Sequence, residues 1–397
     1  MDSGINGSLI YDFVVPVWGA DYIEMFVNAG LPSQLAPGNL PSIARPSTGT
    51  YRIYTTDEGR PLIECAPAFA MLRQLAKVEF HVIETEGRTA YDVVSDAYRS
   101  ALSLSLSAAG AILLLTPDLV FADGTFSSLV TGAEIPSVVL MPVLRTRRSD
   151  VEPILRDQFG TEEEVVTVPS RELVDLAARY LHPFAYDHFW SGDGALHPAN
   201  LIWPVGDEGY LLHGFHLHPL MIVPVEEAVN FAGTLDEDLV ILADPEGTRV
   251  HIGDCSDTVF ALELCQAPPR TEIEGYKRSI EGATDWVVAR TETWHREVAR
   301  HPIRLYRTRP NQENWAAAEK AAATVIETIL RQAGKASIVQ WLRRPRAMVR
   351  RLKRRAIWSR EYGSFDFHPS QSTGLPTPSA FQSLVAFRHD THHATHK

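Results

Sequence analysis

AGAILLLTPDLVFADGTF, residues 109–126, joins an apolar run to a loop that carries two acidic residues. The run AILLLT (111–116) has the length and composition of a fully buried strand, and the Pro, Asp and Gly after it favour a bend. Turn formation alone explains Asp118 and Asp123 at this bend. A carboxylate at the end of a central strand in an open α/β sheet is also well placed to hold a ligand or a cation. The rest of the sequence has to decide between these interpretations.

Strand and helix patterns alternate through the first 150 residues. Extended runs occur at 11–17 (YDFVVPV), 51–56 (YRIYTT), 78–84 (VEFHVIE) and 135–144 (IPSVVLMPVL), and residues 91–109 have the pattern of a long helix. Strands separated by helices imply right-handed βαβ crossovers and a mostly parallel sheet. We therefore expect an α/β fold in which helices flank a mostly parallel sheet.

The pattern loosens after residue 150. We expect a helix over 170–181, one or two strands over 209–224, and short extended pieces at 238–243 and 249–254. Residues 276–333 are predicted to be helical in two segments, broken around HPIRLYRTRPNQ. The expected organisation is an α/β domain (8–270), a helical extension (271–334), a basic amphipathic segment (335–360) and a polar, Pro/Ser-rich tail (361–397) that is typical of disorder.

The composition narrows the class of protein. Of the 397 residues, 45% are hydrophobic and 22% are charged, which is ordinary for a soluble globular protein. The three cysteines are too few for a disulfide framework or a cysteine zinc site, so a reducing cytoplasm is the expected location. The net charge of −12 argues against nucleic acid as the main ligand of the body. No Gly-x-Gly-x-x-Gly, phosphate-loop or Gly-x-Ser-x-Gly motif is present.

Three stretches of the N-terminal half resemble nucleotide-sugar-dependent glycosyltransferases of the GT-A fold. They are YDFVVPVWGADYIEMFVNAGLPSQL (11–35), YRIYTTDE (51–58) and LLLTPDLVFADGTF (113–126). The resemblance covers residues 10–145 well and 145–265 loosely. It implies a GT-A-like fold in which the end of the first strand holds the nucleotide. The fourth strand then carries an Asp-x-Asp pair that holds the divalent metal on the sugar diphosphate.

The Asp-x-Asp pair is degenerate in this chain, because Thr116-Pro117-Asp118 occupies its place. Thr is a poor ligand where a carboxylate is expected, so Asp118 is the one acid of the motif. A sugar diphosphate develops negative charge as it leaves, and Mg²⁺ or Mn²⁺ neutralises that charge. We expect Asp118 to contact the diphosphate or its metal. Asp123 has the position of a helix N-cap.

HGFHLHP (213–219) is the second unusual stretch. If it is a strand, His216 and His218 point to the same face. Two such imidazoles can ligate a metal or bind a diphosphate. In some enzymes of the resembled fold a late histidine completes the metal site, so the resemblance implies that either can partner Asp118. The alternative is one packed core histidine and one exposed histidine.

The remaining candidates follow from the implied fold. Pro16, Val17 and Trp18, at the end of the first strand, are expected to line the nucleotide pocket, and Asp57, after the second strand, to bond a base or ribose. Asp236 and Asp238 are candidates for the base that takes the acceptor hydroxyl proton. Core-edge packing explains Trp18 as well, and turn formation before a strand explains the two later acids. Arg145 is a candidate phosphate ligand or a solvated surface residue.

Residues 335–360 contain ten Lys or Arg and no acid, interleaved with apolar residues and tryptophan. Cationic amphipathic helices of this kind bind anionic membrane surfaces, and Pro345 is expected to break or kink this one. Docking on the acidic body of the same chain and binding of nucleic acid are the alternatives.

The resemblance implies transfer of a sugar from a nucleotide sugar to a glycan or a lipid-linked acceptor. From the few cysteines and the basic segment we expect this activity in the cytoplasm or at the inner face of the membrane. A non-catalytic carbohydrate- or partner-binding protein on the same fold is the alternative. A nucleotidyltransferase is disfavoured, because VPVWGADYIE offers no Gly-rich basic loop after the first strand.

Overall fold

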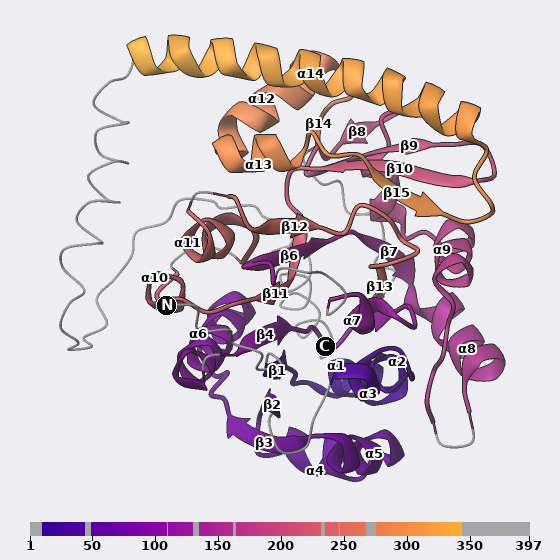
Figure 1. Ribbon diagram of the computed structural model, residues 1–397, viewed down its shortest axis with the longest axis vertical. Coiled ribbons are helices and arrows are strands. Elements are labelled where there is room, and N and C mark those ends of the chain that lie inside the picture. Colours follow the sequence, from indigo (N-terminus) through magenta and orange to yellow (C-terminus); the bar gives the residue numbers. More distant parts are fainter. Residues whose placement is uncertain are drawn as a thin grey trace, which may run out of the picture.

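The computed structural model describes residues 10–43, 49–108, 110–129, 135–161, 164–231, 235–245, 247–266 and 275–343. Its largest element is a seven-stranded sheet in the order β12-β6-β11-β4-β1-β2-β3 (Figure 1). The strands are β1 (Tyr11–Pro16), β2 (Thr50–Thr55), β3 (Lys77–Val82), β4 (Ala111–Leu114), β6 (Val138–Met141), β11 (His218–Ile222) and β12 (Val250–Ile252). Pairing is parallel except at β11, which runs antiparallel to both β4 and β6.

The two faces of this sheet bury separate apolar clusters. Along β4, Ile112 and Leu114 point into one cluster, and Ala111 and Leu113 into the other. This alternation is the strand period of two, and it explains why every residue of β4 is apolar. The α/β class and the mostly parallel sheet flanked by helices are confirmed.

Helices follow the strands of the N-terminal half as expected. The long helix α6 (Ala90–Ala108) precedes β4 and contributes Tyr98 to the core. The other helices of this half are α1 (Ala20–Met25), η1 (Phe26–Gly30), α2 (Leu31–Gln34), α3 (Leu40–Ile43), α4 (Gly59–Glu64), α5 (Pro67–Leu75), α7 (Thr125–Ser128), α8 (Arg148–Phe159) and α9 (Ser170–Arg179).

A second, three-stranded sheet continues from the end of β4. Its order is β5-β13-β7, with β5 (Leu119–Phe121), β13 (Ala261–Cys265) and β7 (Val143–Arg147). The single strand expected over 135–144 is therefore divided between two sheets, because Pro142 separates β6 from β7. β5 and β7 both pair with β13, which comes from far along the chain.

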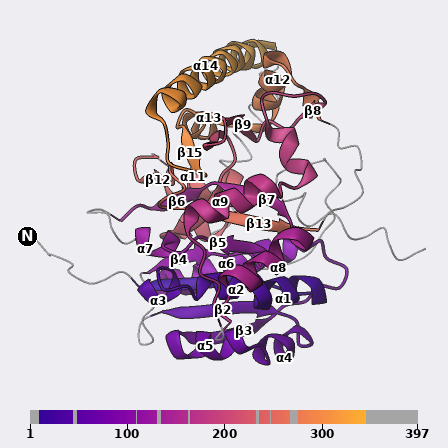
Figure 2. The ribbon, with the colours of Figure 1, turned by 90° about the vertical axis from the view of Figure 1, so that its right-hand side faces the viewer.

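A further layer caps the molecule at the end opposite β3, α4 and α5, as Figures 1 and 2 show. It contains a sheet of β9 (Asn200–Pro204), β10 (Gly209–Gly214) and β15 (Ile303–Tyr306), and the short pair β8 (Ala195–Leu196) and β14 (Tyr276–Lys277). The helical elements are η2 (Pro183–His188), α12 (Ile280–Arg290), α13 (Thr293–Val298) and the long α14 (Gln312–Arg343). β15 pairs with β10, so the spans expected as α/β domain and helical extension share one sheet.

One expectation was wrong. Residues 238–243, expected to be extended, lie in η3 (Leu235–Leu239) and α11 (Val240–Ala243), which with α10 (Glu226–Val229) cover the sheet. Short apolar runs fit a buried helix as well as a strand, which explains the error.

The two helical segments expected within 276–333 are present, with the break around HPIRLYRTRPNQ where it was expected. α12 and α13 precede the break and α14 follows it, and β15 lies within it. The short strand β14 was not expected.

The basic segment enters the structure only at its start, since α14 extends to Arg343. The break expected at Pro345 and the tail 361–397 lie outside the described residues. Among the residues described, no helix combines the length and the apolar character that a membrane crossing requires.

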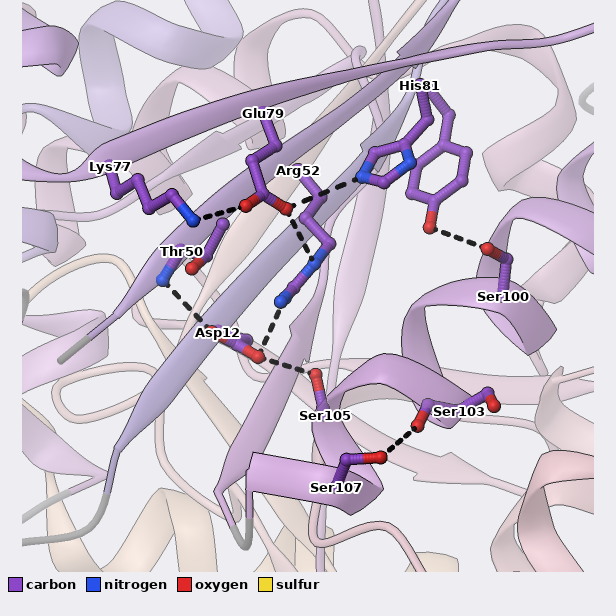
Figure 3. A network of polar contacts seen from close by, with 11 residues as sticks. Asp12, Thr50, Arg52, Lys77, Glu79, His81, Ser100, Ser103, Ser105 and Ser107 are labelled. Carbon is purple, nitrogen blue, oxygen red and sulfur yellow. Dashed lines mark hydrogen bonds and ion pairs between the residues drawn. The ribbon is translucent and has the colours of Figure 1, made fainter.

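A polar network ties β1, β2 and β3 to α6 near the start of these strands (Figure 3). Arg52 on β2 lies 2.7 Å from the Asp12 carboxylate on β1. Asp12 also accepts hydrogen bonds from the Thr50 amide (2.9 Å) and the Ser105 hydroxyl (2.7 Å). Because these groups satisfy both carboxylate oxygens, the network is a structural clamp of the sheet.

Candidate functional site

Asp118 lies where β4 passes into β5, at the carboxyl end of a central parallel strand. Its side chain is only 2% exposed and accepts a hydrogen bond of 2.7 Å from the Thr116 hydroxyl. Its carbonyl accepts the Leu264 amide at 2.9 Å, which fixes the loop against β13. This is the sheet edge at which open α/β proteins hold ligands.

The surroundings of Asp118 shift its titration. Burial, and next the nearby Glu263 carboxylate, raise the pKa of Asp118 to about 7, while the hydrogen bond from Thr116 and the charge of Arg145 oppose the shift. Near neutral pH this carboxyl can therefore carry a proton or a charge. A buried acid whose pKa is shifted toward neutral pH marks a candidate site for catalysis or for ligand binding.

Glu263 and Arg145 form a buried ion pair beside Asp118. The two residues are register partners on β13 and β7, and Arg145 Nε lies 3.1 Å from Glu263 Oε1. The Cys265 thiol donates to the same carboxylate at 2.9 Å. Arg145 is thus not a solvated surface residue. Glu263 was not among the sequence candidates, and the signal that marks it is that it is the one acid inside the apolar strand ALELC (261–265).

Asp123 ties two loops together and does not cap a helix. Its Oδ1 accepts the Gly38 amide at 2.7 Å, and the N-cap of α7 is Gly124. A Cβ on Gly38 would lie 2.6 Å from the Gly124 nitrogen, so the two loops approach as closely as only glycine permits. Asp123 therefore has a structural role.

The two predicted histidines do not share a strand face, because β11 begins only at His218. His218 Nε2 lies 3.1 Å from the Leu114 carbonyl, at the end of β4 that leads to Asp118. His216 belongs to the link between β10 and β11, and its ring stacks on His295 at 4.5 Å and meets Trp286 at 5.3 Å. The expected common face is wrong, since the chain turns between the two residues.

Within the described ranges, no three His, Cys, Asp or Glu side chains are grouped so that they could hold a metal ion. The set Asp118, His216 and His218 is therefore not assembled by the protein alone. Mg²⁺ in phosphate-transfer sites takes one or two carboxylates and completes its shell with phosphates and water. Asp118 could serve as the single protein carboxylate of such a shell. Metal ligation by Asp118, His216 and His218 stays a prediction.

The residues expected to hold the nucleotide lie at the carboxyl ends of β1 and β2. Pro16 and Val17 are buried, Trp18 is half-buried against the core, and Asp57 is exposed in the turn after β2. The Val17 amide donates to the Tyr54 carbonyl at 2.8 Å, which holds the two strand ends together. Trp18 and Asp57 therefore follow neighbouring strands of one sheet edge.

The candidate bases lie on η3, which packs against β11. Asp238 is half-buried, and the side chain of Asp236 lies outside what the structure describes. The turn that the sequence favoured at these positions is replaced by helical backbone. Their role as a base stays a prediction.

Three further histidines lie near Arg145 and were not among the sequence candidates. The His182 amide donates to the Arg145 carbonyl at 2.9 Å, and the ring of His188 meets that of His197 edge-on at 5.3 Å. Burial lowers the pKa of His188 to about 3 and that of His197 to about 4, with repulsion from Arg145 adding to both shifts. Both rings are neutral at physiological pH. They are spread along the chain, so no motif marks them.

No protein-family model matches the chain, and no curated protein matches it. Solved structures do match. S. aureus TarS is 16% identical over 34% of this chain and 22% of its own, with a TM-score of 0.24. The mannosyltransferase PcManGT from Pyrobaculum calidifontis, solved with GDP-Man and Mn²⁺, is 13% identical over 90% of this chain and 83% of its own, with a TM-score of 0.31.

Mouse xyloside xylosyltransferase 1 is 17% identical over 38% of this chain and 56% of its own, with a TM-score of 0.20. The present chain thus spans less than a quarter of TarS and little over half of the xylosyltransferase. Two of the three structures bear the names of sugar transferases. At TM-scores this low the similarities carry no argument about activity, which has to come from the residues of this chain.

Proposed function

We propose that the protein is a glycosyltransferase that moves a sugar from a nucleotide-sugar donor to a glycan or lipid-linked acceptor. One observation carries the proposal: Asp118, a buried acid beside the Arg145–Glu263 pair, lies at the carboxyl end of the central strand β4. The ends of β1 and β2, with Trp18 and Asp57, belong to the same edge of the sheet. Ligands of open α/β folds bind at this edge.

In the proposed reaction the acceptor oxygen forms a bond to the anomeric carbon, and the bond from that carbon to the diphosphate breaks. Asp118 binds the diphosphate side of the donor, and Trp18 and Asp57 bind the nucleotide. Asp238 or Asp236 takes the proton of the acceptor hydroxyl. A divalent cation, Mn²⁺ or Mg²⁺, when bound by Asp118 with His218 or His216, would neutralise charge on the leaving diphosphate.

The test begins with ligand binding. A panel of nucleotide sugars is screened by thermal shift with and without Mn²⁺, because a ligand of the native state raises the melting temperature. Turnover of the ligand that binds is then followed in the wild type and in Asp118→Ala. Stabilisation and turnover that both disappear in Asp118→Ala support a glycosyltransferase.

A second function is favoured by the burial of Asp118, which is 2% exposed and hydrogen-bonded to Thr116. In this alternative the protein keeps the fold and binds a carbohydrate or a partner without catalysis. Tight nucleotide binding without turnover under any metal condition supports this alternative.

We further propose that residues 335–360 bring the enzyme to the cytoplasmic face of an anionic membrane, as a peripheral protein in polysaccharide or glycoconjugate assembly. α14 carries the first of these residues to Arg343. Salt-sensitive pelleting with anionic liposomes, lost on removal of residues 344–397, supports membrane binding. Binding of the detached segment to the protein body, or to RNA, supports the alternatives of self-docking and nucleic-acid binding.

A further inference from the structure

The sheet β5-β13-β7 brings three charged residues together from distant parts of the chain. Glu263 on β13 is the register partner of Arg145 on β7 and of Leu119 on β5, and Leu119 is the neighbour of Asp118. Arg145 is therefore close to two carboxylates. Each carboxylate affects the arginine electrostatically, and both raise its pKa against the effect of burial.

Arg145 forms a hydrogen bond with one of these carboxylates, that of Glu263. Its Nε lies 3.1 Å from one oxygen of Glu263 and 3.2 Å from the other. Asp118 instead accepts the Thr116 hydroxyl at 2.7 Å. The side chains of Glu263 and Asp118 are both almost fully buried, at 6% and 2% exposure. Different exposure to solvent therefore does not explain why Arg145 bonds to Glu263 while Asp118 accepts the Thr116 hydroxyl.

We propose that Glu263 is a positioning residue, which holds the Arg145 guanidinium away from Asp118 and so keeps Asp118 available for ligand. This inference rests on the proposed function, in which Asp118 contacts the metal-bound diphosphate. A buried arginine requires an anionic partner, because an unpaired charge in the interior is strongly destabilising. If Glu263 loses its charge, Asp118 is the remaining acid of the trio and takes the arginine.

A double-mutant cycle, the stability cycle, tests without any ligand whether Arg145 changes its partner from Glu263 to Asp118. The variants are Glu263→Gln, Asp118→Asn and the double variant, each compared with the wild type by melting temperature. We expect Asp118→Asn to change the melting temperature little in the wild type, since it removes one of two neighbouring buried acids. In the Glu263→Gln background it should lower the melting temperature by several degrees. Equal effects in the two backgrounds overturn the inference.

Binding of UDP- and GDP-linked hexoses with Mn²⁺, followed by calorimetry, tests the consequence. Glu263→Gln should weaken binding of the hexose that the wild type binds by roughly tenfold or more. Removing the arginine as well, in Glu263→Gln with Arg145→Met, should restore binding, because Asp118 then has no competing cation. A purely structural role for Glu263 predicts no such rescue, and unchanged binding in Glu263→Gln overturns the inference.

The control is Asp12→Asn, which breaks a comparably buried Arg–carboxylate pair outside the site. It should lower the melting temperature and leave binding unchanged. If the wild type binds none of the nucleotide sugars, the proposed function fails. The stability cycle still decides whether Glu263 keeps Arg145 from Asp118.

Discussion

The seven-stranded sheet and the sheet β5-β13-β7 hold similar ion pairs in different surroundings. In the seven-stranded sheet, Arg52 pairs with Asp12, and the Asp12 carboxylate also accepts hydrogen bonds from a backbone amide and a hydroxyl (Figure 3). In the sheet β5-β13-β7, Arg145 pairs with Glu263, and a second acid, Asp118, lies beside the pair. Both oxygens of the Asp12 carboxylate already have hydrogen-bond partners, whereas an additional buried acid such as Asp118 is stabilised by a cation.

The largest expected effect is a loss of stability when the Asp12–Arg52 ion pair is broken. Asp12→Asn leaves Arg52 buried without its main partner and should lower the free energy of unfolding by about 3–5 kcal/mol. Urea denaturation of the variant and the wild type measures this loss. A loss of under about 1 kcal/mol, as for a surface pair, would contradict the clamp that we assign to Asp12.

For Asp118 we expect a loss of activity without a large loss of stability. Under the proposed function, Asp118→Asn should reduce nucleotide-sugar turnover by on the order of a hundredfold, because it removes the charge that we propose to face the diphosphate and its metal. Its free energy of unfolding should stay close to that of the wild type. Steady-state kinetics and urea denaturation on the same preparations separate the two effects. Similar turnover in Asp12→Asn and Asp118→Asn would contradict the functional difference that we assign to the two ion pairs.

The histidines near Arg145 should make the stability of the protein depend on pH. His188 and His197 have pKa values of about 3 and 4 in the folded protein, against 6.5 for the ordinary side chain. The unfolded chain therefore binds protons first as the pH falls. The stability that the neutral rings provide is complete above pH 6.5 and is lost progressively below it. These two groups should cost about 2 kcal/mol between pH 6.5 and 5.5.

Denaturation at both pH values measures this effect, with the His188→Gln, His197→Gln double variant as control. The double variant should show a smaller dependence on pH than the wild type. An equal dependence would mean that other groups dominate acid unfolding.

The smallest effect is expected for Cys265, whose thiol donates to Glu263. Burial raises the pKa of this thiol, so it should stay protonated and react slowly with iodoacetamide at mildly alkaline pH. Cys65 is exposed and serves as the internal comparison. Cys265→Ala should cost about 0.5–1.5 kcal/mol of stability. Mass spectrometry of the alkylated sites measures the difference, and rapid labelling of Cys265 would contradict the raised pKa of its thiol.

The order of local elements could be predicted because hydrophobic periodicity is a local property of the chain. The strands β1 to β4 and the helix α6 follow directly from runs of apolar residues and their spacing. The same reasoning failed for residues 238–243, whose short apolar run forms helix. Too few residues were present there to separate a period of two from a period of 3.6.

The sequence alone determined that Asp118 ends a buried strand, since an apolar run followed by Thr-Pro-Asp has few other readings. Only the tertiary structure decided what surrounds that acid. Arg145 and Glu263 are 118 residues apart, and the pairing of β7 with β13 brings them together. Their closeness is the result of a non-local strand pairing, which depends on how the whole core packs and leaves no periodic signal in either segment.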